Sequence, residues 1–411
     1  MRILHTSDWH LGRTLYNRAR YEEFEAFLNW LAEILEREQI DVLLVAGDIF
    51  DNTTPSHRAQ ALYYQFLHAI ANSACRHVVV IAGNHDSPSL LDAPQALLRY
   101  LNVHVLGGAS DDPADEVLSL SDTAGKTELI VCAVPYLRDR DIRKAEAGES
   151  LQDKERKLLD GIRAHYQTVG TLAEQIRAGL ASPVPIIALG HLFAAGGKTV
   201  EGDGVRDLYV GSLAHVGADI FPSCIDYLAL GHLHVAQKVA GQEHMRYSGS
   251  PIPMGFGEAS QRKVVLLVEL SAAGEPPVVK AIAVPRWQAL ERISGDWQTI
   301  QQRLQTLRAE QSQAWLEIIY DGAELIGDLR AQLDELIADT RLEILRVKNQ
   351  RLLTRTLHST EDAESLDELD PLEVFQRCLD AHEVTADDRP ALEMAYREVI
   401  SELQHADSQA E

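Results

Sequence analysis

An α/β layered fold is predicted from the alternation of two kinds of segment over the first 270 residues. Short apolar runs rich in β-branched residues alternate with longer segments in which apolar residues recur with helical period. The strand-like runs read ILHT, VLLVA, VVVIA, LIVCAV, PIIAL, YLAL and VVLLVEL. Polar residues follow directly after several of them, as expected where an open α/β sheet forms a site at the carboxyl ends of its strands.

Two helices are expected between the first strands. The stretch RYEEFEAFLNWLAEILERE at 20–38 places its large apolar side chains on one helical face. These are Phe24, Phe27, Leu28, Leu31, Ile34 and Leu35. Residues 57–71 show a similar pattern, so both segments are predicted to cover the face of a sheet.

The chain is expected to contain more than one unit. The small-residue and proline-rich stretch SAAGEPP at 271–277 predicts a boundary after a first domain spanning 1–270. A compact unit is expected over 275–345, with VVKAIAV, WLEIIY and RLEILRV as strands and two helices between them. We predict a linker over 346–370 and a helical segment over 371–405.

Composition excludes several classes of protein. With 45% hydrophobic and 24% charged residues, the 411-residue chain is typical of a globular protein. Its four cysteines lie far apart without a CxxC pair, so neither a disulfide framework nor a thiolate zinc site is indicated, and a reducing cytoplasm fits best. No apolar stretch approaches the roughly 20 residues that cross a bilayer, so we expect neither export nor membrane insertion.

The charge is strongly acidic and unevenly distributed. A formal net charge of −24 argues against coating nucleic acid through bulk electrostatics, although it leaves room for a local site. Residues 359–411 hold 16 Asp and Glu against three Arg, whereas 341–355 holds five basic residues and one acidic residue. The acidic segment should therefore repel DNA and suits a protein partner better.

Two short helices are predicted in the acidic segment. Asp370 and Pro371, followed by Glu373, are typical of a capped helix start. Apolar stripes follow at Leu372, Phe375 and Leu379, and then at Leu392, Tyr396, Val399 and Leu403. These stripes can grip a partner helix or pack on the chain's own domains, and periodicity alone leaves both open.

Ligand-type side chains end five of the predicted strands. Taken singly, a histidine at a strand end is more often an ordinary loop residue, but five strands with the same ending indicate one shared pocket. The glycines that precede four of these residues are expected to allow sharp turns and leave room for metal and substrate. The candidates are Asp8, His10, Asp48, Asn84, His85, His191, His232 and His234.

The chemistry of these side chains points to a two-metal phosphoesterase. Carboxylates, imidazoles and one amide without any thiolate suit a divalent ion such as Mn²⁺, with Fe²⁺, Zn²⁺ or Mg²⁺ as alternatives. There are more ligands than one ion needs, which predicts a pair of ions about 3.5–4 Å apart. Two such ions can clamp a phosphate group and stabilise charge on its attacking and leaving oxygens.

The motifs DWH, GD, GNHD, GH and GHLH, in this order, resemble those of the calcineurin-like metallophosphoesterases. The resemblance implies a sandwich of two β-sheets flanked by helices, with residues 275–345 as a small α/β capping domain followed by C-terminal helices. It also implies two sets of metal ligands that share Asp48. One set is Asp8, His10, Asp48 and His234, and the other is Asp48, Asn84, His191 and His232. By the same resemblance, His85 faces the phosphate, where it orients the substrate or assists the leaving oxygen.

The longer signatures SDWHLG, AGDIFD, AGNHD, DYLALGHLH and YSGSP are similar to those of bacterial DNA nucleases in this family. This likeness implies manganese-dependent exonuclease action on duplex ends and endonuclease action on single strands or hairpins. It further implies an ATPase partner with a long coiled coil, docked on the C-terminal helices, and a homodimer within a heterotetramer. The alternatives are a phosphatase or cyclic-nucleotide phosphodiesterase with the same ligands, and a non-catalytic scaffold.

Several neighbouring residues have weaker assignments. Asp51 stands where many relatives carry histidine, so no phosphate contact is predicted for it; Asp51 or Asp86 can orient a histidine or simply cap a loop. Other histidines match no ligand motif and are expected to be structural, namely His5, His57, His77, His104 and His215. Arg13, Arg18 and Arg58 are expected on a solvated surface, with a contact to the DNA backbone as the alternative.

Overall fold

The computed structural model describes residues 1–143, 150–194, 217–322, 324 and 326–349, together with 372, 375–376, 379–380, 389–390 and 392–397. Most of the predicted linker at 346–370 and much of the helical segment at 371–405 therefore lie outside the described residues, as does His215. Within the described residues, none of the helices combines the length and apolarity required to span a bilayer.

Two six-stranded sheets form the larger part of the molecule. The first has the order β14 (Val278–Ala283), β13 (Val264–Glu269), β1 (Arg2–Thr6), β4 (Val42–Ala46), β5 (His77–Ile81) and β6 (Val103–Leu106). The second has the order β11 (Gln237–Lys238), β12 (Met245–Tyr247), β10 (Tyr227–Gly231), β9 (Ile186–His191), β8 (Thr127–Ala133) and β7 (Val117–Ser121). All seven strands expected from the first 270 residues are present, within a few residues of their predicted bounds.

The two sheets pack face to face because their strands are apolar on both sides. In β4, Val42, Leu44 and Ala46 point into the core between the sheets, together with residues of β8, β9 and β10. Leu43 and Val45 point the other way, into the core beneath the helices. The two-residue period of a strand thus supplies both layers from one continuous apolar run.

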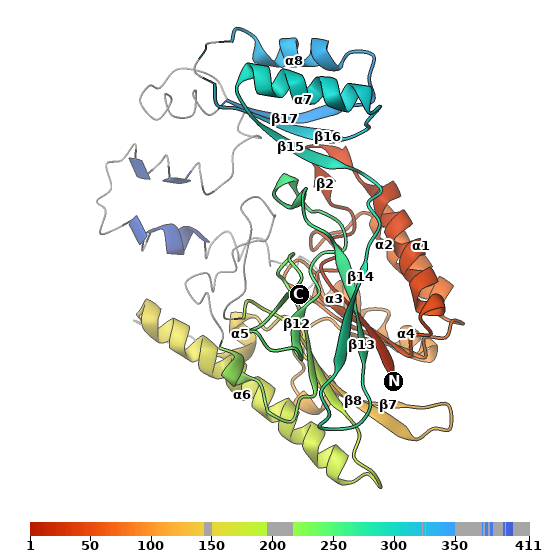
Figure 1. Ribbon diagram of the computed structural model, residues 1–411. Helices are drawn as coiled ribbons and strands as arrows, with labels where there is room; N and C mark the ends of the chain where they lie inside the picture. The colour runs from red at the N-terminus through yellow and green to blue at the C-terminus, as the bar shows by residue number, and fades with distance from the viewer. Residues whose placement is uncertain are drawn as a thin grey trace.

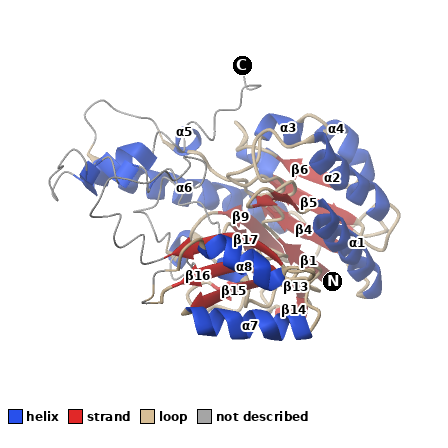
Figure 2. Ribbon diagram, turned by 90° about the horizontal axis from the view of Figure 1, so that it is seen from above, coloured by secondary structure: helices blue, strands red, loops and turns tan. Residues whose placement is uncertain are grey.

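Helices cover both outer faces of this sandwich (Figures 1 and 2). On the first sheet lie α1 (Tyr21–Arg37), α2 (His57–Ile70), α3 (Pro88–Asp92) and α4 (Gln95–Leu98). All six apolar residues predicted for the inner face of α1 are buried. On the second sheet lies α6 (Leu151–Ala178), preceded by the short α5 (Asp139–Ile142). Short 3-10 turns add η1 (Arg99–Leu101), η2 (Pro113–Glu116), η4 (Ala218–Ile220) and η5 (Phe256–Glu258).

A smaller parallel sheet forms a separate unit, labelled at the top of Figure 1. It consists of β15 (Leu290–Gly295), β16 (Trp315–Tyr320) and β17 (Glu343–Asn349), with α7 (Trp297–Ala309) and α8 (Leu329–Ile337) packed on one face. Its other side meets the hairpin of β2 (Thr14–Leu15) and β3 (Arg18–Ala19), where Leu15, Phe256 and Leu290 share a small apolar cluster.

The edges of this smaller unit differ from the sequence expectation. VVKAIAV forms β14, which pairs antiparallel with β13 along its whole length and so extends the first sheet. The stretch at 271–277 is consequently the turn of a hairpin rather than a break between units. Glycine and proline mark turns of both kinds, and composition alone does not distinguish them. At its other end the smaller sheet continues to Asn349, beyond the expected limit at 345.

Parallel pairing places the functional strand ends together. Strands β1, β4 and β5 run parallel in the first sheet, and β9 and β10 run parallel in the second. Their carboxyl ends lead into the loops that carry the candidate ligands, at one end of the sandwich.

Candidate metal centre

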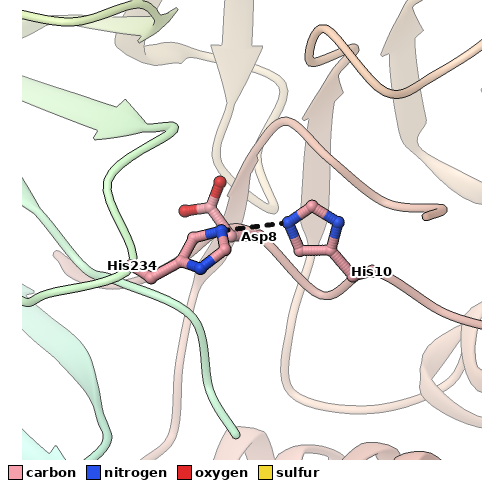
Figure 3. A group of neighbouring side chains, drawn as sticks. All are labelled: Asp8, His10 and His234. Atoms are coloured by element: carbon pink, nitrogen blue, oxygen red, sulfur yellow. Dashed lines mark hydrogen bonds between the residues drawn. The ribbon is translucent and has the colours of Figure 1, made fainter. Parts of the chain in front are cut away.

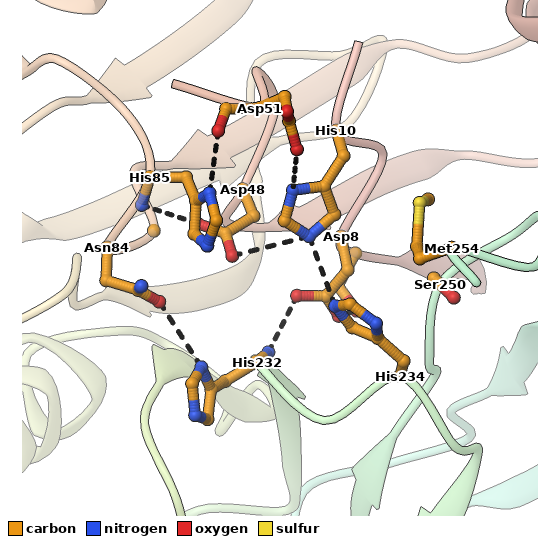
Figure 4. Close-up of polar contacts among 12 residues, drawn as sticks. Asp8, His10, Asp48, Asp51, Asn84, His85, His232, His234, Ser250 and Met254 are labelled. Carbon is orange, nitrogen blue, oxygen red and sulfur yellow. Dashed lines mark hydrogen bonds and ion pairs between the residues drawn. The ribbon is translucent and has the colours of Figure 1, made fainter. Parts of the chain in front are cut away.

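The loops at the strand ends bring all eight candidate residues into one buried cluster, and Figure 4 labels all of them except His191. Their exposed fractions do not exceed 3%. Three groups of side chains have ligand atoms within 4.8 Å of one another: Asp8 with His10 and His234, Asp8 with Asp48 and His191, and His10 with Asp51 and His85. Residues separated by more than 220 positions in the chain therefore meet in a single site.

Asp8, His10 and His234 make up what we call the first half of the cluster (Figure 3). The Nε2 atoms of His10 and His234 are 3.1 Å apart. On the opposite side of each ring, Nδ1 of His10 lies 3.4 Å from a carboxylate oxygen of Asp51, and Nδ1 of His234 lies 3.0 Å from Oε1 of Glu258. Both imidazoles thus turn Nε2 inward and have a carboxylate behind them.

Asn84, His191 and His232 make up the second half. Oδ1 of Asn84 lies 3.0 Å from Nε2 of His191 and 3.2 Å from Nδ1 of His232. Nδ1 of His191 donates to the backbone carbonyl of Ala46 at 2.9 Å, so its Nε2 is the nitrogen with the available lone pair. The position of this ring is therefore set by the end of β4.

Asp48 lies between the two halves. Its Oδ2 is 3.6 Å from Nε2 of His10 and 3.4 Å from Nε2 of His191. Its Oδ1 accepts the backbone N–H of His85 at 2.9 Å. A second link is made by Asp8, whose Oδ1 accepts the backbone N–H of His232 at 2.8 Å.

The donor set fits divalent cations. Because carboxylates face Nδ1 of His10 and His234 and favour a proton there, the two Nε2 atoms carry lone pairs that face each other across 3.1 Å. Such an arrangement is unfavourable unless a proton or a metal ion lies between the lone pairs. The surrounding ligands are carboxylate, imidazole and amide groups, a combination that suits Mn²⁺, Fe²⁺ or Zn²⁺.

The electrostatics keep the central carboxylate charged. Burial would raise the pKa of Asp48, but the imidazoles of His191 and His85 outweigh it and hold that pKa well below its usual range. Burial would likewise lower the pKa of His191, yet Asp48 and Asp8 raise it to about 9. For Asp8 burial prevails and raises its pKa, an effect that a bound cation would reverse.

His85 is held next to the cluster by two hydrogen bonds. Its backbone N–H donates to Asp48, and its Nδ1 donates to the carbonyl oxygen of Asp51 at 2.7 Å. Its ring centroid lies 4.7 Å from that of His10. With Nδ1 protonated and bound to backbone, the remaining nitrogen is the one that can exchange a proton or hydrogen bond with a substrate.

The neighbouring aspartates have different roles. Asp86 accepts the backbone N–H groups of Ile49, Phe50 and Gly83 at 2.8–3.1 Å and so ties two site loops together rather than orienting a histidine. Burial, reinforced by Asp48, raises the pKa of Asp86 to about 7. Asp51 instead faces His10, and Arg13 donates to the same oxygen at 3.0 Å.

Two glycines reveal tighter packing than the sequence suggested. A Cβ at Gly83 would lie 2.1 Å from Oδ1 of Asp48, and one at Gly231 would lie 1.8 Å from the carbonyl oxygen of Ala46. Both contacts are with protein atoms, so these glycines allow neighbouring loops and strand ends to approach. At these two positions a side chain would therefore clash with protein atoms, one of them an oxygen of the predicted ligand Asp48.

Backbone conformation marks the same residues. Asp8, His10 and Asp48 have φ angles of 54°, 49° and 51°, and His232 has a φ of 103°. Non-glycine residues adopt positive φ rarely and at a cost of about 1–3 kcal/mol, and such residues concentrate at functional sites. Strain at four of the predicted ligands supports a functional rather than a structural cluster.

Sequence reasoning missed Glu258 and Lys263, which lie behind His234. Glu258 is fully buried, and it forms an ion pair with Lys263, whose side chain is also buried. Neither residue belongs to a ligand motif, and both follow the last candidate ligand by more than 20 positions. A charged residue within the apolar sequence MGFGE was the only available signal.

The remaining histidines and arginines lie outside the cluster. His5 bonds to the hydroxyl of Tyr227 at 2.9 Å, and His77 bonds to the carbonyl of Ser121 at 2.8 Å. Each arginine contacts an acid: Arg13 pairs with Asp51, Arg18 with Glu343 and Arg58 with Glu22. Arg18 and Arg58 are exposed, as expected from the sequence, whereas Arg13 is mostly buried and contacts the Asp51 oxygen that faces His10, so the expected place on a solvated surface is wrong for Arg13.

Two family models match the chain. The model described as calcineurin-like phosphoesterase matches residues 1–236, a range that contains every predicted ligand. The model described as type 5 capsule protein repressor C-terminal domain matches residues 286–383. Its start agrees with the beginning of the smaller sheet at Leu290.

Curated relatives match along most of the chain. The SbcD subunit of the nuclease SbcCD from Escherichia coli strain K12 is 36% identical over 405 residues, covering 98% of both chains. The protein of the same name from Rhodobacter capsulatus is 39% identical over 294 residues, covering 70% of each. Among solved structures, a dimetal phosphatase from Danio rerio aligns with a TM-score of 0.38 at 12% identity, over 69% of this chain and 99% of that chain. At this level of overlap, no conclusion rests on the solved structure.

Proposed function

The chain belongs to the calcineurin-like phosphoesterase family, among the SbcD subunits of SbcCD nucleases, and we propose that it cleaves DNA phosphodiester bonds with two divalent ions. It is a metal-dependent phosphodiesterase of the nuclease type. The finer proposal is exonuclease action on duplex ends and endonuclease action on single strands or hairpins. Such a protein acts in DNA repair, recombination and replication, by processing DNA ends and secondary structures.

One observation carries this proposal: seven ligand-type side chains from five strand ends meet in one buried cluster with Asp48 at its centre. We assign the first ion to the first half of the cluster plus Asp48, and the second ion to the second half plus Asp48. Mn²⁺ is our choice for both, because the set mixes imidazole and carboxylate ligands without a thiolate. When bound, a pair of such ions stabilises charge on a reacting phosphate.

The protein's own residues provide orientation and proton transfer. Asp48 is held as a carboxylate between the halves, and the carbonyl of Ala46 fixes the ring of His191. We assign His85 to the phosphate, where its second nitrogen can donate a hydrogen bond or a proton to the leaving oxygen. Burial of the cluster excludes bulk water from these interactions, which strengthens them.

The proposed partner is an SbcC-like ATPase with a coiled coil. The described residues of the C-terminal segment are helical. Phe375 and Tyr396 stack with parallel rings 4.1 Å apart, and Asp380 pairs with Arg389, so the two helical stretches contact each other. Leu392 remains 42% exposed, which leaves apolar surface for a partner.

We also propose a homodimer within a heterotetramer, in which the smaller unit caps the nuclease site. An exposed apolar patch at Leu97, Tyr100 and Leu101, with Tyr100 88% exposed, supports a protein contact on the larger domain.

A cytoplasmic location is proposed as well. It is supported by the thiols of Cys75, Cys132 and Cys224, which are free in the described part of the chain.

Cleavage of defined substrates tests the nuclease proposal. The full chain is incubated with end-labelled duplex, hairpin and single-stranded DNA in Mn²⁺, with and without the ATPase, and with EDTA as the blank. We expect Mn²⁺-dependent cleavage of DNA, and stimulation by the ATPase on duplex ends. Preferential hydrolysis of a phosphomonoester or a cyclic nucleotide would favour the alternative phosphatase or cyclic-nucleotide phosphodiesterase, and no hydrolysis of any substrate would favour a scaffold.

Truncation tests the docking proposal separately. A chain ending at Arg355 lacks the acidic helices but keeps every residue of the cluster. It should retain Mn²⁺ binding and intrinsic DNA cleavage while losing co-purification with the ATPase. Unchanged affinity for the ATPase, or an unfolded truncated protein, would assign these helices to the chain's own core.

A further inference from the structure

The carboxylate of Glu258 lies directly behind a predicted metal ligand. Its Oε1 is 3.0 Å from Nδ1 of His234, and Nε2 of the same ring faces His10 in the first half of the cluster. Glu258 is fully buried and His234 is 2% exposed, so water does not compete for this contact. Glu258 reaches the ring from η5, a segment remote in sequence from the ligand motifs.

A buried network fixes the other oxygen of this carboxylate. Oε2 of Glu258 accepts the backbone N–H of Met254 at 3.1 Å and the hydroxyl of Ser250 at 3.2 Å, and it forms an ion pair with Lys263. Nζ of Lys263 also donates to the carbonyl oxygen of His234 and to Ser250, each at 2.9 Å. Figure 4 shows Ser250 and Met254 beside His234. Lys263 thus contacts both the ligand residue and the acid behind it.

Stability alone does not explain a buried ion pair between Glu258 and Lys263. A buried ion pair contributes little compared with well-packed apolar residues of the same volume, because both charges lose their hydration. By contrast, a carboxylate that accepts from Nδ1 fixes the tautomer of an imidazole and increases the basicity of its Nε2. Glu258, whose Oε1 faces Nδ1 of His234, has the geometry of such an orienting carboxylate.

We propose that Glu258 is a positioning residue, which orients His234 toward the ion of the first half, and that Lys263 holds Glu258 in place. The inference rests on the proposed two-metal function and deepens it. It predicts that Glu258 controls the affinity of one ion and leaves the other unaffected, because its hydrogen bonds reach His234 and none of the ligands in the second half.

The test is a Mn²⁺ titration of the full chain carrying Glu258→Gln together with Lys263→Met. The double substitution avoids leaving Lys263 buried without its partner. Calorimetry should show the affinity for one Mn²⁺ reduced about 10–100-fold, with the second ion bound as in the unmodified protein. Cleavage of DNA should recover as the Mn²⁺ concentration is raised.

Glu116→Gln is the matched control. Glu116 is also fully buried and also contacts a histidine, with its Oε2 2.7 Å from Nε2 of His165, but this pair lies outside the cluster. Both Mn²⁺ affinities should remain unchanged in this variant. A loss comparable to that of the double variant would show a general effect of removing a buried acid, and would overturn the inference.

Unfolding temperatures distinguish positioning from stability. If Glu258 positions His234, Mn²⁺ should raise the unfolding temperature of the double variant less than that of the unmodified protein. If its role is purely structural, the unfolding temperature of the variant should be lower by the same amount in EDTA and in Mn²⁺, and this result would overturn the inference. If the double variant does not fold, Glu258→Asp serves instead and should weaken one ion. Two ions bound with unchanged affinity would refute the role of Glu258, while an unmodified protein that binds no Mn²⁺ would refute the proposed function itself.

Discussion

The two halves of the cluster are supported by different kinds of neighbour. In the first half, the outer nitrogens of His10 and His234 face the carboxylates of Asp51 and Glu258. In the second half, the outer nitrogen of His191 donates to a backbone carbonyl at the end of β4. A carboxylate can be removed by a single substitution, whereas a backbone carbonyl cannot.

This difference teaches how one site can combine rigid and adjustable parts. The second half is fixed by parallel strands, whose pairing sets the positions of the carbonyl and the ring. The first half depends on side chains from loops, including η5, where Phe256 packs against Leu15 and Leu290 at the smaller sheet. We therefore expect substitutions outside the ligands to affect the first half more than the second.

Asp48→Ala should have the largest effect, because it removes the group that both halves share. We expect loss of both ions and a decrease in DNA cleavage of about 10⁴-fold or more, since several kcal/mol of charge stabilisation disappear. The fold should persist. Mass spectrometry measures the metal content, single-turnover assays measure DNA cleavage, and circular dichroism checks that the fold is retained. Near-normal Mn²⁺ occupancy would refute the central position of Asp48.

His85→Ala should separate chemistry from metal binding in both halves. Both ions and DNA binding should remain, while the cleavage rate decreases about 10²–10⁴-fold, the usual scale of general acid–base assistance. Mn²⁺ titration beside single-turnover cleavage measures the two properties. If one ion is lost in parallel with activity, His85 is a metal ligand instead.

Asp51→Asn should weaken the first half moderately. The 3.4 Å separation from His10 is longer than that between Glu258 and His234, and Asp51 is partly exposed, so we expect about a 10-fold loss of affinity for one ion. The carbonyl of residue 51 still binds His85. An equal loss for both ions in a Mn²⁺ titration would contradict the distinction between the halves.

His5 affects the stability of the first sheet, and its side chain does not belong to either half of the cluster. Burial lowers the pKa of His5 to about 3, from an ordinary value of 6.5. The unfolded chain therefore takes up the proton first, and stability present above pH 6.5 is lost as the pH falls toward 3. At pH 5 we expect His5 to have lowered the free energy of unfolding by about 2 kcal/mol, from about 1.4 kcal/mol per pH unit. Urea unfolding at pH 7 and pH 5 measures this loss. The loss should be smaller in His5→Gln, and an equal loss in that variant would contradict the role of His5.

The sequence by itself determined the layered fold and the membership of the cluster. Short apolar runs such as VLLVA, which is buried throughout, are typical of inner strands, and the side chains that follow them share one edge when the strands are parallel. The helical face of α1 was likewise readable, since Phe24, Leu31 and Leu35 repeat at helical spacing. These features depend on neighbours within a few positions.

Only the tertiary structure decided which residues stand behind the ligands and where the smaller unit begins. Glu258 reaches His234 from a separate turn, and Asp86 binds backbone groups of another loop, so neither contact leaves a local pattern. Strand β14 joins the first sheet because its edge is open to pairing, which SAAGEPP does not reveal. Contacts between segments distant in the chain depend on packing, and packing is set by the whole fold rather than by local sequence.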